Sequence, residues 1–130
     1  MTDVDRRTAA ARFAADWKGR GDEKQETQRF WIELLTKVFG IDGSTAISFE
    51  VPVKLDHTSF IDGYIESTRV LIEQKGREID LRKGYKQSDG SMLTPYQQAR
   101  RYAGYLPYNQ VPRWIIVCNF QEFQIHDMNR

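Results

Sequence analysis

Apolar residues recur at helical spacing in three parts of the chain. Residues 3–17 are rich in alanine with acids near the start, and glycines at 19 and 21 interrupt that pattern. A second helix is predicted after Asp22, which forms a capping-box pattern with Gln25, and ends at Gly40. A third follows Thr94-Pro95, an N-cap and N1 pair, and ends before Pro107. Their apolar positions are Phe30, Trp31, Leu34, Leu35, Val38 and Phe39 in the second, and Tyr96, Ala99, Tyr102, Ala103 and Leu106 in the third.

Short runs of β-branched and aromatic residues predict five strands. Three lie between residues 46 and 75, in the runs AISFEVPVK, SFIDGYI and RVLIEQK, and two near the end, in WIIVCNF and EFQIHDM. Residues 76–92 are polar and lack an apolar period, so they predict a loop. The order of two helices, three strands, one helix and two strands predicts an α/β fold with a mixed central sheet flanked by helices.

The length of 130 residues fits one domain over residues 1–130 with one hydrophobic core. No apolar run approaches the roughly 20 residues that cross a bilayer, and the first 17 residues lack the apolar core of a secretory signal. With a single cysteine, Cys118, the sequence predicts a cytoplasmic protein without disulfides. The chain stops almost inside its last predicted strand, so we expect it to be a domain of a longer polypeptide.

Positive charge is concentrated in the middle of the chain. The net charge is +1, but residues 67–113 hold nine basic and four acidic side chains, a local excess of five. Such a strip can bind phosphates, although charge alone fits an ordinary solvated surface equally well. The candidate DNA-binding residues are Arg77, Arg82, Lys83, Lys86, Arg100 and Arg101.

Two acids interrupt strands that are otherwise apolar. If a tight turn at Ser67-Thr68 joins the strands, Asp62 lies directly opposite Glu73, with Cβ atoms about 5 Å apart. Two like charges there repel, whereas a divalent cation between them is bound, and carboxylate oxygens at this spacing suit Mg²⁺. A slip of one residue in the register would place the two acids on opposite faces.

Lys75 lies two residues after Glu73, and therefore on the same face of the strand. Beside a metal ion, Lys75 could orient or deprotonate the attacking water. It could also neutralise negative charge on a phosphate that becomes pentacovalent.

The pattern Asp62-x10-Glu73-x-Lys75, within this order of helices and strands, resembles the PD-(D/E)XK nuclease superfamily from about Gly21 to Met128. The resemblance implies a restriction-endonuclease-like fold with an αβββαβ core over residues 21–130, preceded by a helical extension over residues 1–20. It also implies that Asp62 and Glu73 bind Mg²⁺, which Mn²⁺ can replace, while Lys75 serves the nucleophilic water. Ile61 stands where the superfamily name has proline, a variable position.

Three further residues fit the same resemblance. Glu26 lies one turn before Phe30 on the second helix, where several branches of the superfamily use a glutamate to support the metal; its alternative is a surface pair with Arg29. Gln98 and Tyr102 share a face of the third helix and are similar to the Gln-x-x-x-Tyr motif that braces the site of RecB-like nucleases. The alternative is a core tyrosine and a surface glutamine.

A narrower resemblance links residues 22–31, 60–63 and 71–76 to the nuclease region of MmeI-like restriction-modification fusions. In these proteins an adenine-specific, S-adenosylmethionine-dependent methyltransferase and a target-recognition domain follow the nuclease. The resemblance implies a Mg²⁺-dependent endonuclease that acts on double-stranded DNA beside those domains. The 130 residues contain neither a glycine-rich cofactor motif nor an Asn-Pro-Pro-Tyr motif, so we expect no S-adenosylmethionine site among them.

Two other functions remain compatible with the sequence. The first is a catalytically silent nuclease fold that binds DNA or supports a methyltransferase, and the second is a repair exonuclease or junction resolvase. A complete set of Asp62, Glu73 and Lys75 favours an active nuclease, because a purely structural strand has no use for buried acids. The recognition sequence, the cleavage position and the oligomeric state, including a homodimer for double-strand cleavage, stay open.

Overall fold

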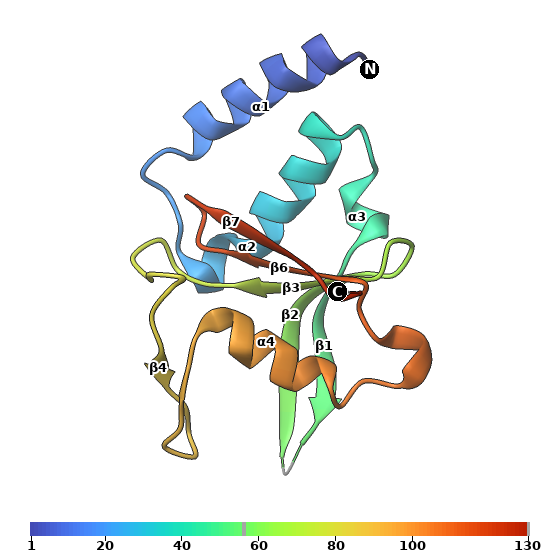
Figure 1. Cartoon of the computed structure of the whole chain (residues 1–130). Coiled ribbons are helices and arrows are strands. Elements are labelled where there is room, and N and C mark those ends of the chain that lie inside the picture. The colour runs from blue at the N-terminus through green and yellow to red at the C-terminus, as the bar shows by residue number, and fades with distance from the viewer. Residues whose placement is uncertain (56, 130) are drawn as a thin grey trace.

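A five-stranded mixed sheet forms the centre of the computed structural model, which describes residues 1–55 and 57–129 (Figure 1). Its strand order is β1-β2-β3-β6-β7; β3 and β6 are parallel and the other neighbours antiparallel. The strands are β1 (Ser48–Lys54), β2 (Thr58–Ile65), β3 (Val70–Gln74), β6 (Trp114–Cys118) and β7 (Phe123–Asp127). The predicted α/β fold with a mixed sheet flanked by helices is confirmed, and it is consistent with a restriction-endonuclease-like fold.

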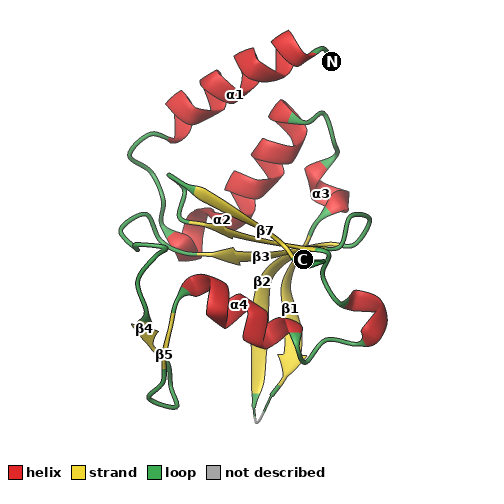
Figure 2. Cartoon of the chain, viewed as in Figure 1, coloured by secondary structure: helices red, strands yellow, loops and turns green. Residues whose placement is uncertain are grey.

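Helices cover both faces of this sheet (Figure 2). They are α1 (Asp3–Trp17), α2 (Glu23–Glu33), the π-helical continuation η1 (Leu34–Val38), α3 (Gly43–Ala46), α4 (Pro95–Ala103) and the 3-10 turn η2 (Tyr108–Gln110). Thr94 caps α4 and Pro95 occupies its first turn, as predicted. Within the described ranges, no helix is both long and apolar enough to span a bilayer.

The start of α2 differs in detail from the expected capping box. Asp22 accepts hydrogen bonds from the backbone N–H groups of Lys24 and Gln25, each at 3.0 Å, and is therefore the predicted N-cap. The reciprocal bond does not come from Gln25. The Asp22 N–H instead donates to the carboxylate of Glu26 at 3.1 Å. Glu26 lies one residue after Gln25, and its side chain bends back over the first turn of the helix.

β3 separates two hydrophobic clusters. Val70 and Ile72 pack with aromatic residues of α1 and α2, whereas Leu71 packs with the face of α4 that carries Ala99. Because alternate residues of a strand share a face, Glu73 follows Leu71 toward α4. The aromatic cluster on the other side includes Phe13, Trp17, Phe30, Trp31 and Phe120.

The register between β2 and β3 is the predicted one. Tyr64 pairs with Leu71, and the ladder extends to Gly63 opposite Ile72. The next pair in this register would be Asp62 and Glu73, but the ladder stops before it. Ser67-Thr68 does not favour a two-residue hairpin turn. The turn places Arg69 at φ 54°, in the left-handed region that few residues other than glycine adopt.

The hairpin of β1 and β2 bends at Glu50, whose φ is 53°. Phe49 packs against the cluster of α1 and α2, yet Val51 packs against the cluster beside α4. Alternate residues of a regular strand would face the same side, so the left-handed residue between them turns the strand over. Since Val51 pairs with Ile61, the register places Asp62 opposite Glu50, at this bend.

Residues 76–92 are more ordered than the sequence predicts. They contain β4 (Tyr85–Lys86), which pairs with β5 (Met92–Leu93) in a small antiparallel hairpin. Strands of two residues are too short to show alternation, and their pairing depends on the turn between them. The expectation of a loop without secondary structure is therefore corrected here.

Trp31→Phe should lower the free energy of unfolding by about 1–3 kcal/mol, because the indole Nε1 donates a buried hydrogen bond of 2.7 Å to Gln74 Oε1. Urea denaturation measures the change. Trp17→Phe is the matched control: its indole bonds Glu33 at 2.9 Å in a partly buried place where Arg29 also serves that carboxylate, so the loss should be smaller. Equal losses in the two variants would show that the buried hydrogen bond to Gln74 stabilises the fold no more than the partly buried bond to Glu33 does.

Candidate active site

Glu73 is a buried acid at the end of β3. The residue is only 3% exposed, and its side chain faces α4. One carboxylate oxygen, Oε2, lies 3.1 Å from the Lys75 ammonium. The other, Oε1, is buried and has no hydrogen-bond partner among the described residues. Leaving a buried acceptor unsatisfied costs about 1–3 kcal/mol, and a proton on the carboxyl group, a water molecule or a cation would each remove this cost.

Asp62 lies where β2 departs from β3. Its Oδ2 accepts the backbone N–H of Gln74 at 2.7 Å, a donor left free because the ladder has ended. The side chain of Gln74 points to the other face of the sheet, where Trp31 donates to it. The end of β3 is therefore held from both faces, and this fixes the strand that carries Glu73.

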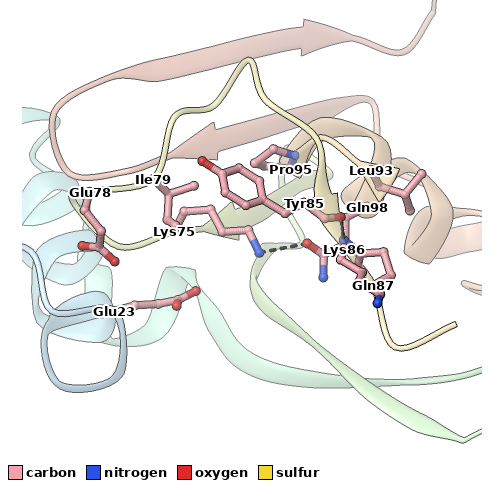
Figure 3. A pocket seen from close by; sticks show the side chains of 10 residues that line it. All are labelled: Glu23, Lys75, Glu78, Ile79, Tyr85, Lys86, Gln87, Leu93, Pro95 and Gln98. Carbon is pink, nitrogen blue, oxygen red and sulfur yellow. Dashed lines mark hydrogen bonds between the residues drawn. The ribbon is translucent and has the colours of Figure 1, made fainter. Parts of the chain in front are cut away.

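Lys75 is oriented by two residues of α4. Its Nζ donates to Gln98 Oε1 at 2.8 Å (Figure 3). Gln98 Nε2 in turn donates to the Tyr102 hydroxyl at 3.0 Å. The structure thus brings Gln98 and Tyr102 together with Lys75. A glutamine amide can accept from the lysine and donate to the tyrosine simultaneously, so this chain of hydrogen bonds fixes the ammonium group.

The charges of this cluster are coupled. Burial raises the pKa of Glu73 above its ordinary value of 4.5, and Asp62 raises it further, while Lys75 lowers it. Burial also raises the pKa of Asp62 to about 6, although the Gln74 N–H lowers it. Burial lowers the pKa of Lys75, but Glu73, Glu23 and Asp62 together outweigh that effect and the net shift is upward. The two acids therefore resist simultaneous ionisation unless a cation shares them.

Glu26 is not brought to this cluster. Its carboxylate is bound by Arg20, at 3.1 Å from Nε, and accepts the N–H groups of Gly21 and Asp22. The alternative, a surface pair of Glu26 with Arg29, does not form either, since Arg29 bonds Glu33 one turn later. Helix periodicity could not foresee these contacts, because Arg20 and Gly21 precede the helix and approach Glu26 only through the path of the preceding loop.

Two other acids lie closer to Asp62. Glu23, the first residue of α2, and Glu50, at the bend of β1, line a cavity of about 530 Å³ together with Asp62. Both raise the pKa of Asp62 by repulsion, and Glu23 also acts on Glu73. Sequence reasoning missed both; the available signal for Glu23 was its position three residues before Glu26, on the same helix face.

A metal ion in this cluster would rely on two carboxylates. Across the described ranges, no group of three or more histidine, cysteine, aspartate or glutamate side chains is arranged to hold one. Mg²⁺ typically takes one or two carboxylates and keeps water at its other positions. Asp62 and Glu73 supply that number, and the unpartnered Glu73 Oε1 is the acceptor that a hard cation would satisfy. The residues present therefore fit Mg²⁺.

Two of the predicted DNA-binding arginines form ion pairs with acidic side chains. Arg82 forms ion pairs with Asp80 and Glu122, and Arg101 pairs with Asp89 at 3.2 Å. Both arginines are tethers for the polar segment before α4. Their charge is largely compensated, which weakens the case that they contact phosphates.

The other four basic candidates lie in different places. Arg77 lines an aromatic cavity with Trp17, and Arg100 lines an apolar one on another side of α4. Lys83 is exposed in the loop before β4. Lys86 lines a further cavity, whose wall also contains Lys75 and Gln98.

Residues 8–130 match the family model described as "MmeI, N-terminal domain". The matched region includes both acids of the cluster, Lys75 and the two residues of α4 that orient it. No curated protein and no solved structure matches the chain.

Glu73→Gln should stabilise the fold at alkaline pH when divalent cations are removed. The raised folded-state pKa of Glu73 gives stability that is fully present below about 4.5 and is lost as pH rises through the raised value. Glutamine cannot ionise, so the variant avoids that loss. Its gain over wild type should exceed about 1 kcal/mol at about pH 8 and vanish at about pH 5.

Thermal unfolding in EDTA at the two pH values measures this difference. Glu66→Gln, in the exposed turn between β2 and β3, is the matched control and should show no pH-dependent gain. A gain for Glu73→Gln that is the same at both pH values would mean that the buried carboxyl does not titrate in this range.

Proposed function

We propose, because the chain belongs to the MmeI N-terminal domain family, that it is the Mg²⁺-dependent DNA endonuclease module of a restriction-modification enzyme. Membership of this family indicates a restriction-modification setting. Hydrolysis of DNA phosphodiester bonds at Asp62, Glu73 and Lys75 is the specific activity that we add to that setting.

One observation carries the proposal: a buried glutamate with an unsatisfied oxygen lies beside a second acid and an oriented lysine. Burying Glu73 is costly, and a structural strand could avoid the cost with an apolar residue of similar size. The same three groups are those that metal-assisted phosphodiester hydrolysis requires, namely two hard ligands and one positive charge.

Each residue then has a distinct task. Asp62 and Glu73 would hold Mg²⁺, which when bound polarises a phosphate oxygen and makes water a stronger nucleophile at neutral pH. Lys75 would orient the attacking water or stabilise negative charge that grows on the phosphate. Gln98 keeps the lysine ammonium in place through a bond of 2.8 Å, and Tyr102 keeps the Gln98 amide in its orientation.

The proposed substrate is double-stranded DNA, and the proposed partners are the methyltransferase and target-recognition domains of the same polypeptide. The family supports this, since its name refers to the N-terminal part of a larger protein. In such a division of labour, this chain supplies chemistry and phosphate contacts, while another domain reads the base sequence.

Mg²⁺ or Mn²⁺ should raise the melting temperature of the protein, because an ion that binds only the folded site stabilises it, by about 2.7 kcal/mol at 100-fold excess over the dissociation constant. Asp62→Ala should abolish the shift. Glu66→Ala, which removes an exposed acid from the turn, should retain it. A full shift in Asp62→Ala would place the metal elsewhere.

Lys75→Ala should eliminate Mg²⁺-dependent cleavage of supercoiled plasmid while preserving the metal-induced rise in melting temperature, since the lysine acts on water and phosphate. Lys83→Ala, which removes an exposed lysine from the nearby loop, is the matched control and should cleave like wild type. Cleavage by Lys75→Ala near the wild-type rate would remove the lysine from the mechanism. If the wild-type protein does not cleave plasmid with Mg²⁺, or cleaves it only in EDTA, the proposed Mg²⁺-dependent nuclease activity is rejected.

A further inference from the structure

The cavity of about 270 Å³ beside Lys75 has a second lysine in its wall. Lys75, directly after β3, and Gln98 of α4 line it on one side, and Tyr85 and Lys86 line it from the β4–β5 hairpin (Figure 3). Glu23 of α2 also reaches this cavity. The catalytic lysine and the hairpin therefore share one space, although 11 positions separate Lys86 from Lys75 in the sequence.

We propose that Lys86 binds a backbone phosphate of the DNA strand that enters this cavity, next to the phosphate that reacts at Lys75. This inference rests on the proposed nuclease function. It makes the β4–β5 hairpin a part of the substrate-binding surface and singles out Lys86 from the six basic residues predicted to touch DNA.

The distribution of the basic residues supports this selection. The acids paired with Arg82 and Arg101 compensate their charges. Arg77 and Arg100 line cavities that do not contain Lys75. Lys83 is exposed but does not line the cavity. Lys86 is exposed, shares the cavity with Lys75, and forms no ion pair with any described residue.

The hairpin is held in place, so Lys86 has a defined position. Its tip is closed by the hydrogen bond from the Gln87 N–H to the Ser91 carbonyl at 2.8 Å. The tip is also tied to α4 by the ion pair of Asp89 with Arg101, at 3.2 Å. At its base, the Tyr85 hydroxyl accepts the Asp80 N–H at 3.0 Å. The helix that orients Lys75 therefore also anchors the hairpin.

The charges of the cavity suit a bound phosphodiester. Its lining contains two lysines, Lys75 and Lys86, and two acids, Glu23 and Glu78, which belong to the side of α2 and the turn after β3. Two neighbouring phosphates of one strand, one beside each ammonium group, would each face one positive charge, whereas a phosphate near the acids would be repelled. Lysine acts as a point charge without base discrimination, so this contact should be independent of DNA sequence.

The test is a salt titration of duplex binding in EDTA, where hydrolysis does not interfere. Each phosphate neutralised contributes a slope of about 0.9 to the dependence of log K on log salt concentration. Lys86→Ala should reduce the magnitude of the wild-type slope by about 0.9 and weaken binding roughly eightfold at 0.1 M salt. Lys86→Arg should restore the slope, and the change should be equal for unrelated duplex sequences.

Lys83→Ala is the matched control and should keep the wild-type slope. An unchanged slope in Lys86→Ala, or an equal reduction in Lys83→Ala, would overturn the assignment, as would a loss confined to one DNA sequence. Cleavage of plasmid with Mg²⁺ is measured separately on the wild type. If the wild type fails to cleave while the slopes differ as expected, the nuclease is rejected and the phosphate contact stands.

Discussion

The burial of Glu73 beside Lys75 is the constraint on which the rest of the site depends. The carboxyl group of a residue that is only 3% exposed must be neutral, paired or bound to a cation. The free energy of burying an isolated charge exceeds the whole free energy of unfolding of a typical domain. Lys75 serves one oxygen and the other remains unsatisfied within the described part of the chain. The fold therefore holds an acid in a state that a divalent cation would stabilise.

Two layers of helix keep this acid in place from opposite sides. On one side, Trp31 of α2 donates to the Gln74 side chain, and on the other, Gln98 of α4 accepts from Lys75. Successive residues of an extended chain point in opposite directions. Glu73 and Lys75 therefore face α4, while Gln74 between them faces Trp31, and the chain does not have to bend. The end of β3 is thereby held on both faces, and side chains on a strand are positioned more accurately than side chains on a loop.

The second acid, Asp62, reaches the site through an irregularity of the sheet. Glu50 adopts a left-handed conformation, β1 turns over, and β2 pairs with β3 only from Gly63 onward. This departure frees the Gln74 N–H, which the Asp62 carboxylate then accepts. A regular ladder would have used that N–H for a backbone bond, so the bend and the position of Asp62 are parts of one arrangement.

The sequence by itself determined the three longer helices, the long strands, the register of β2 on β3 and the grouping of Asp62, Glu73, Lys75 and Gln98. These depend on periodicity and short spacings, which local geometry translates directly into faces and neighbours. Tertiary structure alone decided that Glu23 approaches Asp62 while Glu26 turns to Arg20, and that Lys86 shares a cavity with Lys75. Such contacts join segments whose relative positions are set by packing of the whole core, and no spacing along the chain encodes them.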